Sequence, residues 1–194
     1  MTTVVVSAGT YHLPFHRLMD WVGQWYAGHS DLELIVQHGP SRPVSGAVNH
    51  ALLPYQQLLQ LCRAADAVVL QGGAGGVMDM NRLGIVPIVV PRVPTDDEVV
   101  DDHQLIFTAE MARLGIIHRA TTLAQLTSLL DQAQAGTLQT QSQQLATAPG
   151  IGAFNSLDLP PPALQVSSTL RRLGATFGGI VRQRLRRSAS GPHR

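Results

Sequence analysis

Lysine is absent from this sequence, because every one of its 14 basic residues is arginine. A P-loop needs a lysine after its glycines to reach the phosphates of a nucleoside triphosphate. The sequence therefore excludes that class of nucleotide-binding site, although it contains a glycine-rich segment.

Cysteine and long apolar runs are also scarce. Cys62 is the only cysteine, which excludes an internal disulfide or a cysteine-based metal cluster and agrees with a reducing compartment. No stretch reaches the roughly 18 uncharged apolar residues of a membrane-spanning helix, and the start lacks the basic region of a signal peptide. We therefore expect a cytoplasmic protein.

The charge is unevenly distributed along the chain. Only 14% of the residues are charged and 44% are hydrophobic, a balance typical of a packed globular protein. Seven arginines lie at or beyond Arg171, whereas the first 170 residues carry seven arginines against 13 acids, a formal charge of −6. Because an acidic body offers no extended basic surface, we expect no nucleic-acid binding.

Strand and helix patterns alternate over the first 130 or so residues. Apolar, β-branched runs predict strands at residues 3–7, 32–37, 67–70, 85–90 and 116–119. Helical periodicity predicts helices from Pro14 onward and at residues 55–65, 77–83, 103–114 and 123–133, and residues 38–49 are predicted to be a loop. This alternation predicts an α/β fold, a Rossmann-like parallel sheet with helices on both faces, which binds ligands at the carboxyl ends of its strands.

Composition predicts three parts of the chain. Residues 1–134 form the domain, residues 135–165 form a linker rich in Gln, Thr, Ala and Pro, and residues 166–194 form a basic tail. Within the tail, the segment from Leu170 to Arg187 contains apolar residues interspersed with arginines. This composition predicts a basic amphipathic helix that can lie on anionic lipid. The alternative is a disordered or partner-docking tail, which its glycines favour.

Glycine-rich turns follow two of the predicted strands. Gln71 to Gly76 lies between a strand and a helix, where backbone N–H groups can approach an anion such as a diphosphate. A tight structural turn is the alternative for this segment. Likewise, Gly9 and Thr10 follow the first strand and either hold phosphate or turn the chain.

Acidic residues precede the helix that begins at His103. Asp97, Glu98, Asp101 and Asp102 together suggest a divalent metal, because clustered carboxylates bind hard cations. The commoner meaning of acids before a helix is capping and interaction with the helix dipole, so we predict no metal site. Gln104 can both donate to and accept from a sugar hydroxyl.

Several segments, taken in order, resemble the C-terminal, nucleotide-binding domain of glycosyltransferase family 28, one half of a GT-B fold. They are SAGT at Ser7, PFHRL at Pro14, VQHGPSRP at Val36, and ADAVVLQGGAGGVMDMNRLGIVPIVVPR at Ala65, followed by EVVDDHQ at Glu98. The resemblance runs from Val4 to about Leu130. Within the family, the chain is most similar to the small catalytic subunits of two-component bacterial exopolysaccharide and dolichol-pathway transferases, whose acceptor domain is a separate membrane-bound chain.

The resemblance implies a UDP-sugar-dependent hexosyltransferase of polysaccharide biosynthesis. This donor-binding subunit would transfer sugar with inversion, without metal or cofactor, to a lipid-linked or glycan acceptor. A membrane-anchored acceptor-binding subunit would be its partner, at the inner face of the plasma membrane. The implied donor-binding residues are Gly9, Thr10, Gln71, Gly72, Gly73, Ala74, Gly75, Gly76, Asp79, Arg92, Asp102, His103 and Gln104, and no residue is assigned as the catalytic base.

Three positions depart from the family pattern. Asp79, which would face the ribose, replaces the usual Glu, and Gly76 stands where Thr or Ser is common. Gln71 replaces a His, and a glutamine can donate a hydrogen bond but cannot carry a proton near neutral pH. The alternative prediction is therefore a non-catalytic nucleotide-sugar-binding or regulatory subunit that retains the fold.

Overall fold

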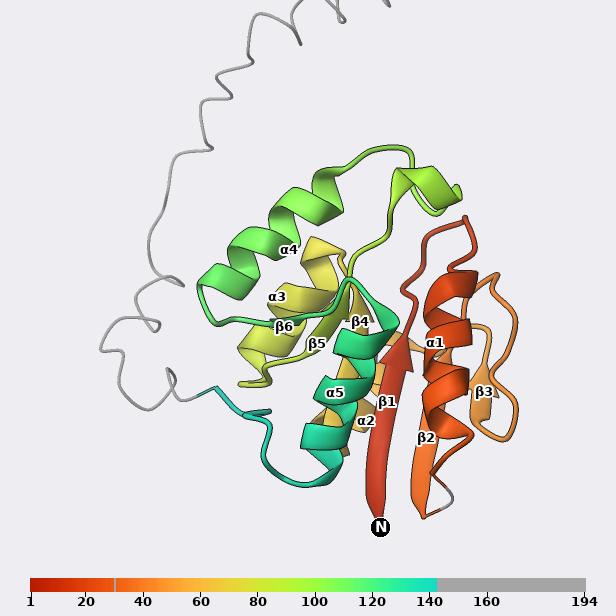
Figure 1. Ribbon diagram of the computed structural model, residues 1–194, viewed down its shortest axis with the longest axis vertical. Helices are drawn as coiled ribbons and strands as arrows, with labels where there is room; N and C mark the ends of the chain where they lie inside the picture. Colours follow the sequence, from red (N-terminus) through yellow and green to blue (C-terminus); the bar gives the residue numbers. More distant parts are fainter. Residues whose placement is uncertain (30, 143–194) are drawn as a thin grey trace, which may run out of the picture. The chain divides into compact units, whose positions relative to one another are not determined.

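A six-stranded parallel sheet lies at the centre of the domain. The computed structural model describes residues 1–29 and 31–142 (Figure 1). The strands are β1 (Thr2–Ser7), β2 (Leu32–Gln37), β3 (Val48–His50), β4 (Ala67–Gln71), β5 (Ile88–Val90) and β6 (His118–Arg119). Their order is β3-β2-β1-β4-β5-β6, and every neighbouring pair is parallel. This arrangement confirms the predicted Rossmann-like α/β fold.

Helices cover both faces of the sheet. They are α1 (His16–Tyr26), α2 (Tyr55–Ala64), α3 (Ala74–Arg82), α4 (His103–Arg113) and α5 (Leu123–Gln134). Successive side chains of β1 point to opposite faces, so Val4 and Val6 pack with α1 and α5, whereas Val5 packs with α2, α3 and α4. Figure 1 shows α1 and α5 in front of the sheet. The apolar residues whose periodicity predicted the helices are therefore those that pack against the sheet.

Some element boundaries differ from those predicted. The short strand β3 lies partly within residues 38–49, which were predicted as loop, and its residues are only partly covered. The predicted strand at residues 85–90 shortens to β5, because Pro87 has no N–H to donate to a neighbouring strand. Helix α3 begins at Ala74 rather than Val77, which places two glycines of the turn in its first helical turn.

The residues after α5 return to the sheet. Val86 N donates to Thr140 O at 2.9 Å, and Ser142 N donates to Gly84 O at 2.8 Å. The first residues of the predicted linker, 135–142, thus pair with the segment that precedes β5. The rest of that linker and the predicted tail, including Leu170 to Arg187, lie outside the described residues.

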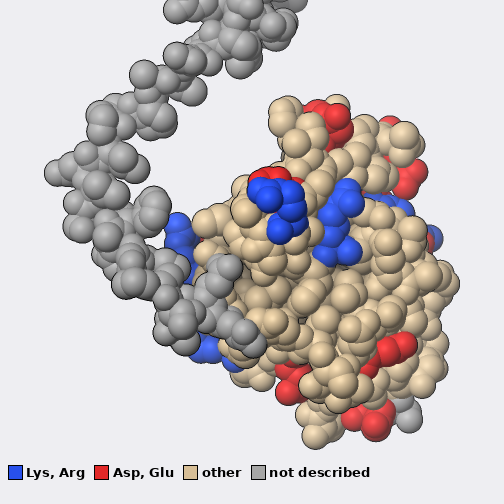
Figure 2. Space-filling view, turned by 60° about the vertical axis from the view of Figure 1, so that its left-hand side comes forward, with Lys and Arg blue, Asp and Glu red and all other residues tan. Residues whose placement is uncertain are grey.

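Charged groups are sparse on the surface seen in Figure 2. Uncharged residues cover most of the face that is not drawn in grey, and the arginines occur in small groups. That part of the face has no continuous basic stripe of the kind that follows a nucleic-acid backbone. Among the described helices, none combines the length and the apolar character needed to cross a membrane.

Candidate donor-binding site

The predicted site residues gather at the carboxyl ends of β1, β4 and β5. From β1 the chain moves outward to β3, and from β4 it moves outward in the other direction to β6, so the strand order reverses between β1 and β4. Ligands bind to open α/β sheets at such a switch point. Gly9 follows β1 with a φ of +76°, and a Cβ added there would overlap the side-chain amide of Gln71, which ends β4. The two predicted loops therefore meet at the switch point.

The glycine turn (Gln71–Gly76) exposes backbone donors. Val77 N is bonded to Gly73 O at 3.2 Å, so the N–H groups of Ala74, Gly75 and Gly76 precede the first hydrogen bond of α3. All three of these residues are exposed, and a Cβ at Gly75 would meet no atom within 4 Å. Together with the positive end of the helix dipole, these N–H groups form a surface that suits an anion.

The start of α4 packs against the other side of the glycine turn. A Cβ added at Gly72 would lie 2.9 Å from both Gln104 Oε1 and Thr108 Cγ2. Such contacts are too close for a real side chain, so glycine at position 72 is what allows α4 to approach β4. This approach brings the Gln104 side chain against the glycine turn.

Arg92 lies beneath this surface rather than on it. Its side chain has no exposed area, and the guanidinium carbon lies 4.6 Å from the centre of the Phe15 ring. The guanidinium donates to four backbone carbonyls, those of Leu13 and Pro14 at 3.0 Å, Glu98 at 2.9 Å and Ala8 at 3.1 Å, and to Gln71 Oε1 at 2.7 Å. Desolvation lowers the pKa of Arg92, and the nearby Glu98 carboxylate opposes that shift. The structure therefore places Arg92 at the site but directs its charge toward the protein's own oxygens.

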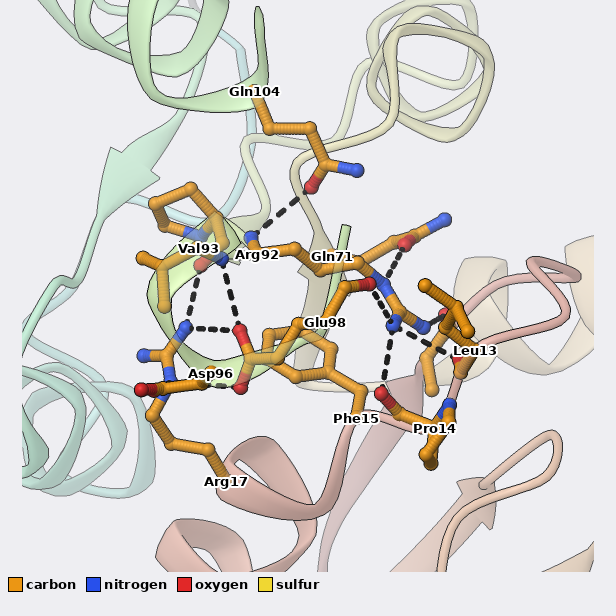
Figure 3. Close-up of polar contacts among 12 residues, drawn as sticks. Leu13, Pro14, Phe15, Arg17, Gln71, Arg92, Val93, Asp96, Glu98 and Gln104 are labelled. Carbon is orange, nitrogen blue, oxygen red and sulfur yellow. Dashed lines mark hydrogen bonds and ion pairs between the residues drawn. The ribbon is translucent and has the colours of Figure 1, made fainter. Parts of the chain in front are cut away.

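Glu98 faces inward and forms a bidentate pair with Arg17 of α1. Arg17 Nε donates to Glu98 Oε1 at 2.9 Å, and Arg17 Nη2 donates to Glu98 Oε2 at 2.7 Å. Val93 N adds a third bond to Glu98 Oε2 at 2.9 Å, and the glutamate is only 3% exposed. The pair fixes residues 91–98 against α1 (Figure 3). The sequence did not predict this role, although Arg17 lies between the buried residues Phe15, which precedes α1, and Leu18.

Asp101, not Asp102, binds the first residue of α4 through its side chain. Asp101 Oδ1 accepts from His103 N at 3.1 Å and pairs with His103 Nδ1 at 2.9 Å. The hydrogen bond that His103 donates to Asp101 raises the pKa of His103, and the same contact lowers the pKa of Asp101. Across residues 1–29 and 31–142, no three His, Cys, Asp or Glu side chains are grouped so as to hold a metal. His103 itself is 84% exposed beside the site.

Asp79 and Thr10 lie at the surface of the site. Asp79 Oδ1 pairs with Arg82 Nη1 at 3.1 Å, and a hydrogen bond to Asp79 raises the pKa of Tyr55. Arg82 is 74% exposed, and ion pairs at such positions contribute little to stability. A ligand hydroxyl could therefore replace this pair at small cost, while Thr10 is exposed in the loop after β1.

The site is an open surface rather than an enclosed cavity. A hollow of about 670 Å³ lies beside α1 and one of about 650 Å³ lies beside α5, and neither is lined by a residue of the glycine turn. The exposed residues of the glycine turn, Ala74, Gly75 and Gly76, thus belong to neither of these hollows.

Comparison with known proteins identifies the family of this chain and shows structures with a similar fold. Residues 3–153 match the family model of the glycosyltransferase family 28 C-terminal domain. Among solved structures, the glycotransferase of kitacinnamycin aligns with a TM-score of 0.54 and 19% identity over 71% of this chain and 36% of that chain. MurG from Acinetobacter baumannii aligns with a TM-score of 0.50 and 18% identity over 68% of this chain and 42% of that chain. The NMR solution structure of ALG13 aligns with a TM-score of 0.49 and 18% identity over 80% of this chain and 94% of that chain.

The likenesses to the kitacinnamycin glycotransferase and to MurG show the fold alone, since both are below 25% identity. This chain spans only 36% of the kitacinnamycin glycotransferase and 42% of MurG. No curated protein matches the chain.

Proposed function

Because this chain belongs to the family of the glycosyltransferase 28 C-terminal domain, we propose that it binds a UDP-sugar and supplies the donor half of a glycosyltransferase. One observation carries the proposal. The unbonded N–H groups at the start of α3 lie next to Gly9 and Gln104, on one open surface at the switch point of the sheet. A diphosphate fits this surface because it presents several oxygens to backbone donors at a helix N-terminus.

The proposed reaction is an inverting transfer of a hexose-type sugar to a lipid-linked or glycan acceptor. As the bond between sugar and diphosphate breaks, negative charge grows on the leaving UDP, and the N–H groups of α3 stabilise that charge. These dipoles perform the task that a metal would otherwise perform. The acceptor hydroxyl loses its proton to a base on the opposite side of the sugar, which we assign to a partner chain.

Asp79 is proposed to bind the ribose. It lies on α3, two residues beyond the buried Val77, and it contacts Arg82 through Oδ1 and also Tyr55. A carboxylate can accept hydrogen bonds from two neighbouring hydroxyls. We therefore expect Asp79 to leave its exposed arginine partner and accept from ribose when UDP binds.

The proposed partner is a membrane-anchored acceptor-binding subunit at the inner face of the plasma membrane. One observation supports it: the proposed donor surface is exposed at Ala74, Gly75 and Gly76. A second protein surface would exclude water from the reaction and position the acceptor hydroxyl against the sugar.

A non-catalytic nucleotide-sugar-binding or regulatory subunit is the second candidate. Gln71 favours it, because this side chain cannot transfer a proton and its oxygen is already bonded to Arg92. Both candidates predict nucleotide-sugar binding. Only the first predicts that a complex with the acceptor-binding chain turns over a UDP-sugar and loses turnover when the glycine turn is mutated.

Titration of the full chain with UDP and UDP-sugars, followed by NMR or calorimetry, tests the binding proposal. We expect a dissociation constant of about 1 mM or tighter, weakened roughly tenfold by Asp79→Ala. Asp20→Ala is the matched control, because Asp20 also forms an exposed pair, with Arg42 at 2.9 Å, and lies on α1. Absence of UDP or UDP-sugar binding to the folded chain with its partner present would contradict the proposal.

A further inference from the structure

Arg92 holds the oxygen atoms of two glutamine side chains at the proposed site. Gln71 Oε1 accepts from Arg92 Nε at 2.7 Å, and Gln104 Oε1 accepts from the backbone N of Arg92 at 3.1 Å. Both of these Arg92 nitrogens can only donate, so each amide must turn its oxygen toward them and its NH2 group away. Figure 3 shows both amide nitrogens directed away from Arg92.

The two amides line opposite sides of the glycine turn. A Cβ added at Gly73 would lie 3.2 Å from Gln71 Nε2, and one added at Gly72 would lie 2.9 Å from Gln104 Oε1. Gln71 Nε2 also lies against Gly9, on the far side of the switch point. In the part of the chain that the structure describes, the hydrogen bonds of these two side chains are those to Arg92. Their NH2 groups are therefore available to a ligand at the start of α3.

We propose that Arg92 is a positioning residue that orients the side chains of Gln71 and Gln104, so that their NH2 groups donate hydrogen bonds to the diphosphate and the sugar of the donor substrate. This inference rests on the proposed function and adds a specific role to each side chain. Each amide oxygen accepts one hydrogen bond from Arg92 and keeps a second lone pair, so Arg92 fixes the direction of the NH2 group and leaves Gln104 able both to donate and to accept. The buried charge of Arg92 acts on the ligand through these amides, because a hydrogen bond to the oxygen polarises the NH2 group.

The orientation exists before any ligand binds. The carbonyls that hold the Arg92 guanidinium come from residues 8, 13 and 14 beside α1 and from residue 98. They belong to the protein backbone, so the guanidinium and both amides stay fixed, and binding does not have to order them. Because amides do not titrate, their contribution to binding stays constant with pH, unlike that of a histidine at position 71.

In a purely structural role, the two glutamines would only accept hydrogen bonds from buried donors of Arg92. In the proposed role, their NH2 groups also bind the ligand. Substitution by glutamate separates the two roles, because glutamate keeps an oxygen for Arg92 but has no NH2 group and adds a negative charge. Gln71→Glu and Gln104→Glu should therefore stay folded while repelling a diphosphate. Gln132→Glu is the control, since Gln132 is exposed on α5 and its amide bonds only Ser128.

Each full-length variant is unfolded with urea and then titrated with UDP-N-acetylglucosamine and UDP-glucose. We expect Gln71→Glu and Gln104→Glu to unfold at urea concentrations no lower than the wild type, and to bind at least about tenfold more weakly. Gln132→Glu should match the wild type in both measurements. In the wild type, the side-chain amide NMR signals of both glutamines should shift on titration.

Three results would overturn the inference. Wild-type affinity in both glutamate variants would mean that the NH2 groups do not contact the ligand, even though the proposed function stands. A large loss of stability in Gln71→Glu would mean that accepting a hydrogen bond from Arg92 is not what the oxygen at position 71 contributes to the fold. Failure of the wild-type chain to bind any UDP-sugar would overturn the proposed function and this inference with it.

Discussion

Replacing Gly9 by alanine should disturb both the backbone and the site. The φ of Gly9 is +76°, a left-handed conformation that costs an alanine about 1–2 kcal/mol. The added Cβ would also overlap the Gln71 amide and push it from Arg92. A hydrogen bond to a charged group contributes about 1.5–3 kcal/mol, so partial loss of this bond brings the expected destabilisation to about 2–4 kcal/mol.

Gly136→Ala separates the two effects. Gly136 has a φ of +68°, and a Cβ there would meet no atom within 4 Å. It ends α5, where its N–H bonds Ala133 O at 3.0 Å, and it is not among the predicted site residues. The control substitution therefore brings the backbone strain alone, and we expect it to lower stability by about 1–2 kcal/mol.

Urea denaturation measures the stability difference, and titration with a UDP-sugar measures the effect on the site. Gly9→Ala should lose more stability than Gly136→Ala and should bind the UDP-sugar more weakly, because the Gln71 NH2 group is displaced. Equal stability of the two variants would refute the reasoning, since it would show that the overlap relaxes without moving Gln71 away from Arg92.

Three further predictions follow from the electrostatics. Asp101 raises the pKa of His103 above its usual 6.5, so His103 loses its positive charge, and the UDP-sugar affinity should weaken, as the pH rises through that raised pKa. When UDP-sugar affinity is measured against pH, Asp101→Asn should move this fall in affinity to lower pH. Glu98→Gln should lower the free energy of unfolding by about 2–3 kcal/mol in urea, because the NH2 group that replaces one carboxylate oxygen cannot accept from Arg17 and the negative charge beside Arg17 is lost; an unchanged midpoint would contradict this. Burial raises the pKa of Cys62 to about 11, so roughly one thiol in a thousand is ionised at about pH 8, and alkylation followed by mass spectrometry should be slow until urea unfolds the chain.

The sequence predicted those elements whose apolar residues form a continuous pattern. Strands β1 and β2 agree with prediction within one residue, because each is a run of buried β-branched or leucine residues. Strand β3 was missed since its three residues carry no apolar alternation. The start of α3 was placed too late, because glycine has a low helix propensity, whereas burial of Val77 and Met80 keeps the preceding glycines helical.

The meeting of the Gly9 loop with the glycine turn was easier to predict than the direction of the side chains around it. Gly9 follows one predicted strand and Gln71 follows another. The carboxyl ends of parallel strands lie at the same edge of the sheet, so the two residues could be expected close together. No pattern in the sequence indicates that Arg92 turns inward, since that depends on carbonyls brought together from residues 8, 13, 14 and 98. Likewise, Glu98 was grouped with its acidic neighbours, although only packing against α1 selects it for Arg17.

The openness of the glycine turn bears on how the proposed partner would act. In water, backbone dipoles and neutral amides stabilise a diphosphate only weakly, because the effective dielectric constant near an exposed group is high. Covering the surface with a second chain would lower that dielectric constant and strengthen every contact to the leaving group. Partner binding and UDP-sugar binding should therefore reinforce each other by the same factor, since coupling between two sites is reciprocal. Measuring UDP affinity with and without the acceptor-binding chain tests this coupling, and equal affinities would mean that the partner does not close over the glycine turn.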